Sequence, residues 1–371
     1  MRSVTFKVFW FILFSTIYGC NQYSPVDQNS NQTEGQKTPV NHTWETLGLQ
    51  GKLVPNLVIV RNYLFACATR DGLFRLRLDV ENAQWEYLGF ADSTLVRGTR
   101  YGVVALFFNP IDCEIIMGIS THRFISEIGV YKSRDFGHTW VPSDSGIRTV
   151  QYPKSSEVAS IKGSPLSAKN VLLGLSGSIY KSTSGGQNWK RVWGNQGTGL
   201  GVKTITFHAT KPNSIWAGGE TSRFQPYLLY SVDLGETWQM IFPLPPLGPY
   251  GHGDNAVFDV AIDHLNEGTI YVGMGGLIIK THDYGQTWKK ILGWEDGIYA
   301  FWKLAINPKN TTEVLATGAR LYRTRDSGSN WEKVLPPDNR NLLYALAVDW
   351  EKRILYTSAS SPGNGIYKLS F

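Results

Sequence analysis

Short runs of β-branched, aliphatic and aromatic residues alternate with turn residues along most of the chain. Between positions 258 and 292 they read FDVAID, TIYVGMG, LIIKTHD and TWKKIL, which predicts four strands joined by tight connections. Runs that match the second of these occur seven times. They read YLFACAT, EIIMGIS, NVLLGLS, SIWAGGE, TIYVGMG, EVLATGA and ILYTSAS. The pattern therefore predicts seven repeats of a four-stranded antiparallel meander.

An eight-residue pattern, S/T-x-D-x-G-x-T/N-W, interrupts five of these repeats, and its copies begin 49, 49, 50 and 43 residues apart. An Asp side chain can accept hydrogen bonds from the amides of the turn that it starts, and Gly can adopt the positive φ that closes the turn. We expect the Trp to pack between neighbouring sheets. The second copy has Ser184 in place of Asp, so its turn is expected to be held less firmly. The structural residues of the five copies are Ser133, Asp135, Gly137, Trp140, Ser182, Gly186, Trp189, Ser231, Asp233, Gly235, Trp238, Thr281, Asp283, Gly285, Trp288, Thr324, Asp326, Gly328 and Trp331.

The two ends of the repeat region complement each other. The last repeat supplies three strands, and the segment TWETL at 43–47 matches the fourth strands NWEKV and TWKKI of other repeats. If this N-terminal strand completes the last sheet, the ring closes and neither sheet edge is exposed. Residues 43–371 number 329, or 47 per repeat. We therefore predict an all-β, seven-bladed β-propeller of four-stranded antiparallel blades, closed by the N-terminal strand.

The first 42 residues differ in character from the repeats. Residues 1–19 combine Arg2 and Lys7 with an apolar run at 8–17, which is typical of a signal peptide. The sequence IYGC at 17–20 resembles the lipobox of bacterial lipoproteins, which implies lipidation of Cys20 and anchoring in the bacterial cell envelope, on the periplasmic side or at the cell surface. The alternative is an ordinary secretory peptide. Residues 20–42 are polar, so we expect a flexible tether.

The charged, cysteine and histidine residues limit which partners, disulfides and cofactors the chain is expected to have. The 36 basic and 30 acidic residues include no Lys/Arg run, so nucleic acid is a poor candidate partner. Cys67 and Cys113 are expected to be separate, mostly buried thiols, with a disulfide between them as the alternative. The histidines have no metal-ligand spacing and no nucleotide-binding glycine motif is present, so we expect no metal and no cofactor.

The five turns resemble the Asp-box, or BNR, repeats of sialidases, sortilin receptors, two-propeller xyloglucanases and the photosystem II stability and assembly factor family. In size and predicted lipid anchor the chain is most similar to the assembly-factor family. The resemblance implies that the Asp-box residues are structural and that ligands bind on the opposite face. That face would be built by the loops from strand two to three and from strand four to the next blade.

Several polar residues lie in these predicted loops. Arginines suit carboxylate or phosphate groups on a small anionic ligand or on an acidic protein surface. The alternative is a set of solvated charges balanced by loop acids such as Glu220. His252 and Asp254 could contribute metal ligands, but the surrounding Pro/Gly-rich sequence favours a rigid loop over the mouth of the ring. The candidate residues of the ligand or partner face are Arg97, Arg100, Arg123, Arg223, His252, Asp254 and Arg340.

The sequence favours a lipid-anchored, extracytoplasmic propeller, monomeric, that acts as a protein-binding or assembly module. Its loop face would hold a protein partner or an anionic or glycan ligand. The alternative is a carbohydrate-active propeller, a glycan binder or a sialidase-like or xyloglucanase-like glycoside hydrolase. Glycosidases need two suitably placed carboxylates, and loop acids are available. The Arg-Ile-Pro motif of sialidases is absent, so no catalytic residue is assigned.

Overall fold

The computed structural model describes residues 43–69, 71–90, 102–120, 129–147, 158–175, 177–195, 201–223, 225–241, 244, 256–293, 300–335, 342–359 and 365–371. The signal peptide, Cys20 and the tether predicted for residues 1–42 lie outside this part of the chain. Within it, no helix is long and apolar enough to cross a membrane.

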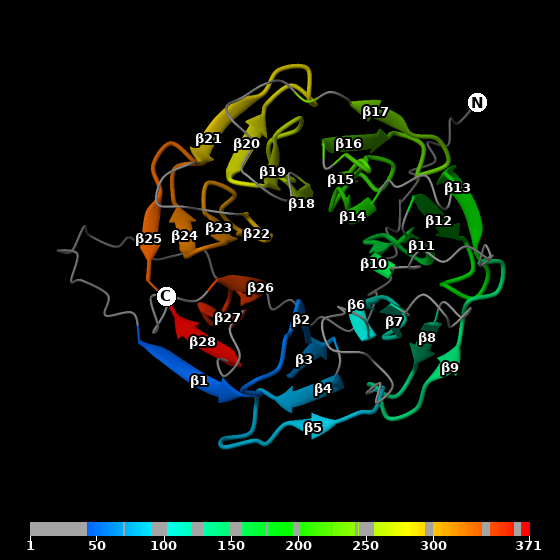
Figure 1. The fold of residues 1–371 in the computed structure, drawn as a ribbon, viewed down its shortest axis with the longest axis vertical. Coiled ribbons are helices and arrows are strands. Elements are labelled where there is room, and N and C mark those ends of the chain that lie inside the picture. Colours follow the sequence, from blue (N-terminus) through cyan, green and yellow to red (C-terminus); the bar gives the residue numbers. More distant parts are fainter. Residues whose placement is uncertain are drawn as a thin grey trace, which may run out of the picture.

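The predicted fold is confirmed: seven four-stranded antiparallel sheets form a closed ring, as Figure 1 shows. Blade one contains β2 (Asn56–Val60), β3 (Tyr63–Ala68), β4 (Gly72–Arg77) and β5 (Glu86–Tyr87), and blade two contains β6 (Gly102–Phe108), β7 (Ile115–Ser120), β8 (Gly129–Ser133) and β9 (Val141–Pro142). Blade three contains β10 (Val158–Ser164), β11 (Ser167–Leu175), β12 (Ser178–Ser182) and β13 (Lys190–Gly194), and blade four contains β14 (Gly201–Phe207), β15 (Ile215–Glu220), β16 (Pro226–Ser231) and β17 (Gln239–Ile241). Blade five contains β18 (Val257–Ile262), β19 (Ile270–Met274), β20 (Leu277–Thr281) and β21 (Lys289–Gly293), and blade six contains β22 (Lys303–Ile306), β23 (Val314–Thr317), β24 (Leu321–Thr324) and β25 (Glu332–Val334). Blade seven contains β26 (Leu343–Asp349), β27 (Ile354–Ala359), β28 (Ile366–Ser370) and β1 (Trp44–Gly48).

The N-terminal strand closes the ring as predicted. β1 pairs antiparallel with β28, with Trp44 opposite Leu369 and an ion pair of 2.8 Å between Glu45 and Lys368. The indole of Trp44 donates to the Leu335 carbonyl of blade six at 2.8 Å. On the other side, Trp85 of blade one donates to the Leu47 carbonyl at 2.6 Å. Hydrogen bonds to both neighbouring blades therefore hold the closing strand.

The five repeated turns, called Asp turns below, join the third to the fourth strand of blades two to six and share one hydrogen-bond pattern. In the turn at 231–238, the Ser231 hydroxyl donates to Asp233 at 2.8 Å and accepts from the Gly235 amide at 2.9 Å. The Thr237 amide donates to Asp233 at 2.9 Å. Hydrogen bonds from the Thr237 hydroxyl and amide lower the pKa of Asp233 to about 2. The side chains predicted to stabilise these turns therefore do so.

The backbone conformation of the Asp turns explains why each of them contains a glycine. It also shows how the second copy accommodates Ser184 in place of Asp. Gly235 has a φ of +81°, and the residue before it, Leu234, is left-handed as well, at +61°. In the second copy this preceding position is Gly185, which adopts a φ of +66° without strain. Ser184 still accepts the Asn188 amide at 2.9 Å. A glycine therefore accompanies the shorter side chain in this turn.

The apolar core lies between adjacent blades. One buried cluster combines Leu172 and Ile179 of blade three with Val202 and Ile205 of blade four, and the partly buried Trp238 packs against it. Cys67, also buried, is a free thiol, so it forms no disulfide with Cys113. Burial raises the pKa of Cys67 to about 12. The prediction of a separate, buried thiol is therefore confirmed for Cys67 and wrong for Cys113, which is half-buried and disulfide-bonded.

Buried cations connect several pairs of neighbouring blades on the side of the Asp turns. Lys280 of blade five donates to the Ser327 carbonyl of blade six at 2.9 Å, and Lys181 of blade three forms an ion pair of 2.7 Å with Glu236 of blade four. Arg75 of blade one extends this arrangement to the first Asp turn. Because these cations are 3–6% exposed, their pairing contributes to the rigidity of the ring.

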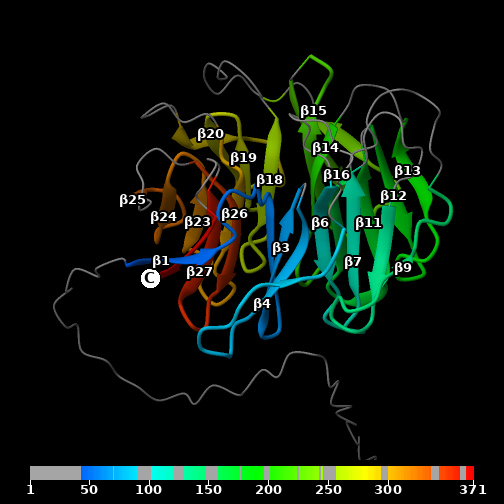
Figure 2. The same ribbon diagram turned by 60° about the horizontal axis from the view of Figure 1, so that its bottom comes forward.

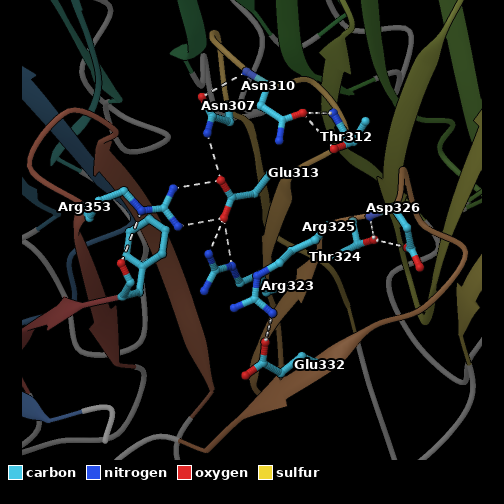
Figure 3. Close-up of polar contacts among 11 residues, drawn as sticks. Asn307, Asn310, Thr312, Glu313, Arg323, Thr324, Arg325, Asp326, Glu332 and Arg353 are labelled. Carbon is cyan, nitrogen blue, oxygen red and sulfur yellow. Dashed lines mark hydrogen bonds and ion pairs between the residues drawn. The ribbon is translucent and has the colours of Figure 1, made fainter. Parts of the chain in front are cut away.

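The largest of these connections lies between blades six and seven, and Figure 3 shows it in detail. Glu313, 7% exposed at the side chain, accepts hydrogen bonds from Arg323, from Asn307 at 2.8 Å and from Arg353 at 2.7 and 2.9 Å. Arg353 also donates to the Phe371 carbonyl at 3.2 Å. Burial alone would raise the pKa of Glu313, but the hydrogen bonds from Arg353, Asn307 and Arg323 outweigh it and lower the pKa to about 2. Glu313 is thus a charged connection between the two blades.

Candidate binding site at the axis of the ring

Strand topology divides the ring into two faces. In each blade the strands alternate in direction, so the Asp turn and the connection from first to second strand lie at one end, called the Asp-turn face. The connections from second to third strand, and from the fourth strand to the next blade, lie at the other end, called the loop face. Figure 2 shows the strands crossing the ring between its two faces. The innermost strands therefore begin on the loop face.

Only part of the predicted loop-face set falls within the described residues. Arg223 lies between β15 and β16 on the loop face and is exposed, and its amide donates to the Thr221 hydroxyl at 3.3 Å. Arg320 also lies on this face, between β23 and β24. The remaining candidates lie outside the described residues: Arg97, Arg100, Arg123, His252, Asp254 and Arg340. Their role in binding stays a prediction.

The innermost strands turn a different set of side chains toward the axis of the ring. The pairing of β14 with β15 skips Lys203, and the pairing of β18 with β19 skips Phe258. Such a one-residue bulge redirects the side chain of the unpaired residue. The same bulge falls on Val104 in β6 and on Ala159 in β10. Blades two to five therefore each place one bulged residue near the loop-face end of the innermost strand.

A row of contacts runs from the bulged Lys203 of blade four through blades five, six and seven. The Lys203 ammonium lies 5.8 Å from the centre of the Phe258 ring. Phe258 meets Trp302 edge to face at 4.4 Å, and Trp302 stacks on Tyr344 at 4.7 Å with an interplanar angle of 18°. Such aromatic pairs add about 0.5–1.5 kcal/mol each beyond their area burial. One cation and three rings therefore form an ordered arc, the axial arc, on the inner wall of blades four to seven.

Two carboxylates lie close to the axial arc. Glu220 forms an ion pair of 2.9 Å with Lys203 through Oε1, and its Oε2 is buried without a hydrogen-bond partner. Asp259 accepts from the Thr204 hydroxyl at 3.0 Å and from the Leu304 amide at 2.9 Å. Asp259 thus joins the innermost strands of blades four, five and six. Asp259 is therefore fully engaged in inter-blade hydrogen bonds, whereas Glu220 keeps one unpartnered oxygen.

Two further lysines on innermost strands lack such partners. Lys162 on β10 and Lys303 on β22 form no ion pair or hydrogen bond with any described residue. Lys162 is exposed although its neighbours Ser160 and Ile161 are buried. Desolvation, followed by the like charge of Lys303, lowers the pKa of Lys162, while the carboxylate of Asp259 opposes the shift.

The chemistry of the axis is that of cationic and aromatic side chains. Among the described residues, no group of three or more His, Cys, Asp or Glu side chains could hold a metal ion. What the innermost strands do offer is ammonium groups and aromatic rings, which recognise anions and apolar groups of a partner.

These residues were not among the predicted site residues, because the candidate side chains were expected in the loops. A usable signal was present: SIKGS, GVKTI and FWKLA each place one lysine in a predicted first strand that is otherwise small, β-branched or apolar. In an innermost strand, such a lysine has only the axis in which to stay hydrated.

Comparison with known proteins extends the fold assignment. No family model matches the chain. It is 30% identical over 122 residues to an oligoxyloglucan-reducing end-specific xyloglucanase of Emericella nidulans, an alignment that covers 30% of this chain and 14% of the xyloglucanase. The chain thus spans only a small part of that relative, and the whole enzyme's activity does not transfer with the alignment.

Solved structures with the same fold include enzymes and binding proteins. The GH74 xyloglucanase of Xanthomonas campestris superposes with a TM-score of 0.64 at 18% identity, covering 87% of this chain and 53% of the enzyme. YCF48 bound to D1 peptide superposes with a TM-score of 0.59 at 13% identity, covering 89% of this chain and 94% of YCF48. The chain therefore spans about half the length of the xyloglucanase and nearly all of YCF48. At these identities the likeness shows a seven-bladed β-propeller and no more.

Proposed function

We propose that the protein is a lipid-anchored, extracytoplasmic binding module that holds a protein partner on its loop face, over the axial arc. The observation that carries the proposal is the composition of the axis. Cationic and aromatic side chains lie at its loop-face end, where Glu220 pairs with Lys203 and Asp259 accepts inter-blade hydrogen bonds. Such a surface is suited to recognition, and aromatic side chains commonly supply the strongest contacts of a protein interface.

One relative and one feature of the chain's own sequence support this proposal. YCF48, which matches the chain over nearly its whole length, has been solved with a bound peptide. The lipobox-like sequence ending at Cys20 would anchor such a module in the bacterial cell envelope, as a monomer beside its partner. Arg223, exposed on the loop face, is a candidate for peripheral contacts to an acidic partner surface.

A carbohydrate-active function is the second candidate, favoured by the likeness to xyloglucanases. The axial arc argues against it. A sugar would stack on an aromatic face, and one face of Trp302 is already covered by Tyr344. The chain spans about half of the xyloglucanase length. Incubation with xyloglucan oligosaccharides and measurement of new reducing ends tests this candidate; turnover abolished by Glu220→Gln would establish it in place of the binding proposal.

The binding proposal is tested by quantitative capture of crosslinked partners from the envelope of cells that express the full chain. Trp302→Ala removes the central ring of the axial arc. Trp350→Ala is the matched control, because Trp350 packs on Phe371, away from the arc. We expect Trp302→Ala to lose captured partner and Trp350→Ala to retain it, with folding of both checked by circular dichroism. Equal capture by Trp302→Ala and the unchanged protein would refute the proposal.

A further inference from the structure

Three exposed apolar side chains occupy the same position in turns of the Asp-turn face that join a first strand to a second. They are Ile111 of blade two, Leu166 of blade three and Leu265 of blade five, with exposed fractions of 41%, 61% and 60%. In each turn the amide of this residue donates to the side chain two residues earlier, at 3.0, 3.3 and 3.0 Å; the acceptors are Asn109, Ser164 and Asp263. The three residues, called the turn tips below, are therefore held at equivalent points of one face.

Hydrogen bonds link these turns from blade to blade. The Asn109 side chain of blade two donates to the Ala168 carbonyl at the start of β11 in blade three, at 3.1 Å. The Asn266 side chain, in the turn of blade five, donates to the Thr311 hydroxyl in the matching turn of blade six at 3.2 Å. The turn tips therefore project from a connected surface rather than from independent loops.

The matching turns of two other blades carry polar residues at this position. Thr210 of blade four and Lys309 of blade six donate their amides to His208 and Asn307, at 3.3 and 2.9 Å. The Lys309 ammonium is paired with Glu351 of blade seven at 3.0 Å, so these two charges compensate each other. The turn tips thus lie on the side of blades two to five, and an ion pair occupies the side of blades six and seven.

The N-terminal part of the chain joins the ring on this same face. β28 runs toward the Asp-turn face, and Trp44 at the start of β1 lies opposite Leu369 near the end of β28. The chain thus enters blade seven where an Asp turn joins the third and fourth strands of blades two to six. Cys20 precedes Trp44 by 24 residues, which a flexible chain spans with an average of about 27 Å. A lipid anchor at Cys20 would therefore attach to the ring from the Asp-turn face.

We infer that the Asp-turn face lies on the lipid surface that holds the anchor, with Ile111, Leu166 and Leu265 inserted among the headgroups. This inference rests on the proposed function, because it requires the lipid anchor at Cys20. Transfer of an exposed aliphatic side chain out of water is favourable, and apolar residues at an interface add to the attachment that a lipid chain provides. The loop face would then point away from the membrane and stay open to the partner.

Two separate attachments explain why the ring would keep one orientation. The tether enters at blade seven, whereas the turn tips lie on blades two, three and five, at other sides of the ring in Figure 1. A tether alone leaves the ring free to rotate, and the turn tips would hold the face against the lipid. Because Lys309 is already paired with Glu351, we expect uncharged phosphatidylcholine to suffice.

Fluorescence quenching in vesicles tests the orientation. The full chain is purified from membranes with its anchor and reconstituted into phosphatidylcholine vesicles that carry a nitroxide quencher at the headgroup. A fluorescent amino acid replaces Leu265 in one protein and Arg223, exposed on the loop face, in another. We expect quenching at position 265 and none at position 223. Equal quenching at the two positions, or quenching at position 223 alone, would overturn the inference.

A second comparison tests whether the turn tips cause the orientation. Ile111→Ser with Leu166→Ser changes two exposed positions, so the ring should fold normally. The matched control, Val141→Ser with Met240→Ser, removes two exposed apolar side chains from the outer strands β9 and β17. With the fluorescent residue at position 265, the first pair should lose most of the quenching and the control should retain it. Equal quenching in the two proteins would refute the role of the turn tips.

The outcomes separate this inference from the proposed function. If the full chain is absent from the membrane fraction, the lipid anchor and the orientation are both wrong. If the chain is in that fraction but position 265 is not quenched, only the orientation is wrong, and partner capture that depends on Trp302 still supports the proposed function. A protein crosslinked to the turn tips in cells, without quenching in vesicles, would assign them to a protein interface and overturn the inference.

Discussion

Replacing Glu313 with Gln should destabilise the ring more than any surface charge change, because it leaves Arg323 and Arg353 facing a neutral amide. Arg323 is 6% exposed and Glu313 is 7% exposed at the side chain. Removing one partner of a buried ion pair costs about 3–5 kcal/mol. The pKa of Glu313 gives a second figure: it falls from 4.5 to about 2, which corresponds to about 3 kcal/mol of stability at neutral pH. The two figures agree in order of magnitude.

The assay is thermal unfolding followed by circular dichroism. An unfolding entropy of about 2.1 cal/mol/K per residue gives about 0.7 kcal/mol/K for the propeller, so we expect Tm to fall by about 4–7 °C. The control is Glu351→Gln, which breaks the exposed Lys309–Glu351 pair between the same two blades and should shift Tm by less than about 1 °C. A shift equal to that control would refute the role given to Glu313.

The effect of Glu313→Gln must also depend on pH in a definite direction. A carboxyl whose pKa is lowered by folding stabilises the native state above its ordinary pKa, and this stabilisation is lost as the pH falls through the lowered value. The difference between the two proteins should therefore be constant from pH 7 to pH 5 and shrink between pH 4.5 and pH 2. A difference that grows on acidification would contradict this explanation.

Three further predictions concern the framework. Deleting residues 43–49 should expose the edge of β28 and give an aggregating or protease-sensitive product, whereas deleting 21–42 should leave Tm nearly unchanged; equal stability would refute the ring closure. Gly285→Ala should cost about 1–3 kcal/mol in denaturant unfolding, because φ is +85° and the new Cβ would lie 2.9 Å from the Trp216 ring; an unchanged midpoint would count against this packing. Cys67 should not react with a thiol reagent at pH 8 until the protein unfolds, and rapid native labelling would contradict its burial.

Much of the fold could be predicted from the sequence because its determinants are local. An Asp turn needs only a hydroxyl, a carboxylate and a glycine within eight residues, and Asp233 makes the bonds that its spacing predicts. Closure by β1 followed from counting strands, since a ring with one missing strand leaves only one place for a matching segment. The left-handed residue before the glycine, as at Leu234, was not predicted because the pattern leaves that position free.

The axial arc and the Glu313 network could not be predicted because their members come from different blades. Lys203, Phe258 and Trp302 meet only because bulges and neighbouring blades turn them toward one axis, and a bulge shifts the register without a clear sequence signature. Glu313 and Arg353 are 40 residues apart, and their contact depends on how blade six packs on blade seven. Predictions from the sequence concentrated on the arginines of the long loops, where polar residues stand out, and overlooked lysines embedded in strands.

The central claim, that a partner binds at the loop-face end of the axis, is tested most directly by site-specific photocrosslinking in intact cells. The photoreactive residue p-benzoylphenylalanine replaces Tyr344 in the axial arc, and in a second protein it replaces Tyr284, which is 42% exposed on the Asp-turn face. Mass spectrometry then identifies the adducts. We predict a protein adduct from position 344 and none from position 284. Adducts from position 284 alone would place the partner on the opposite face and contradict the claim.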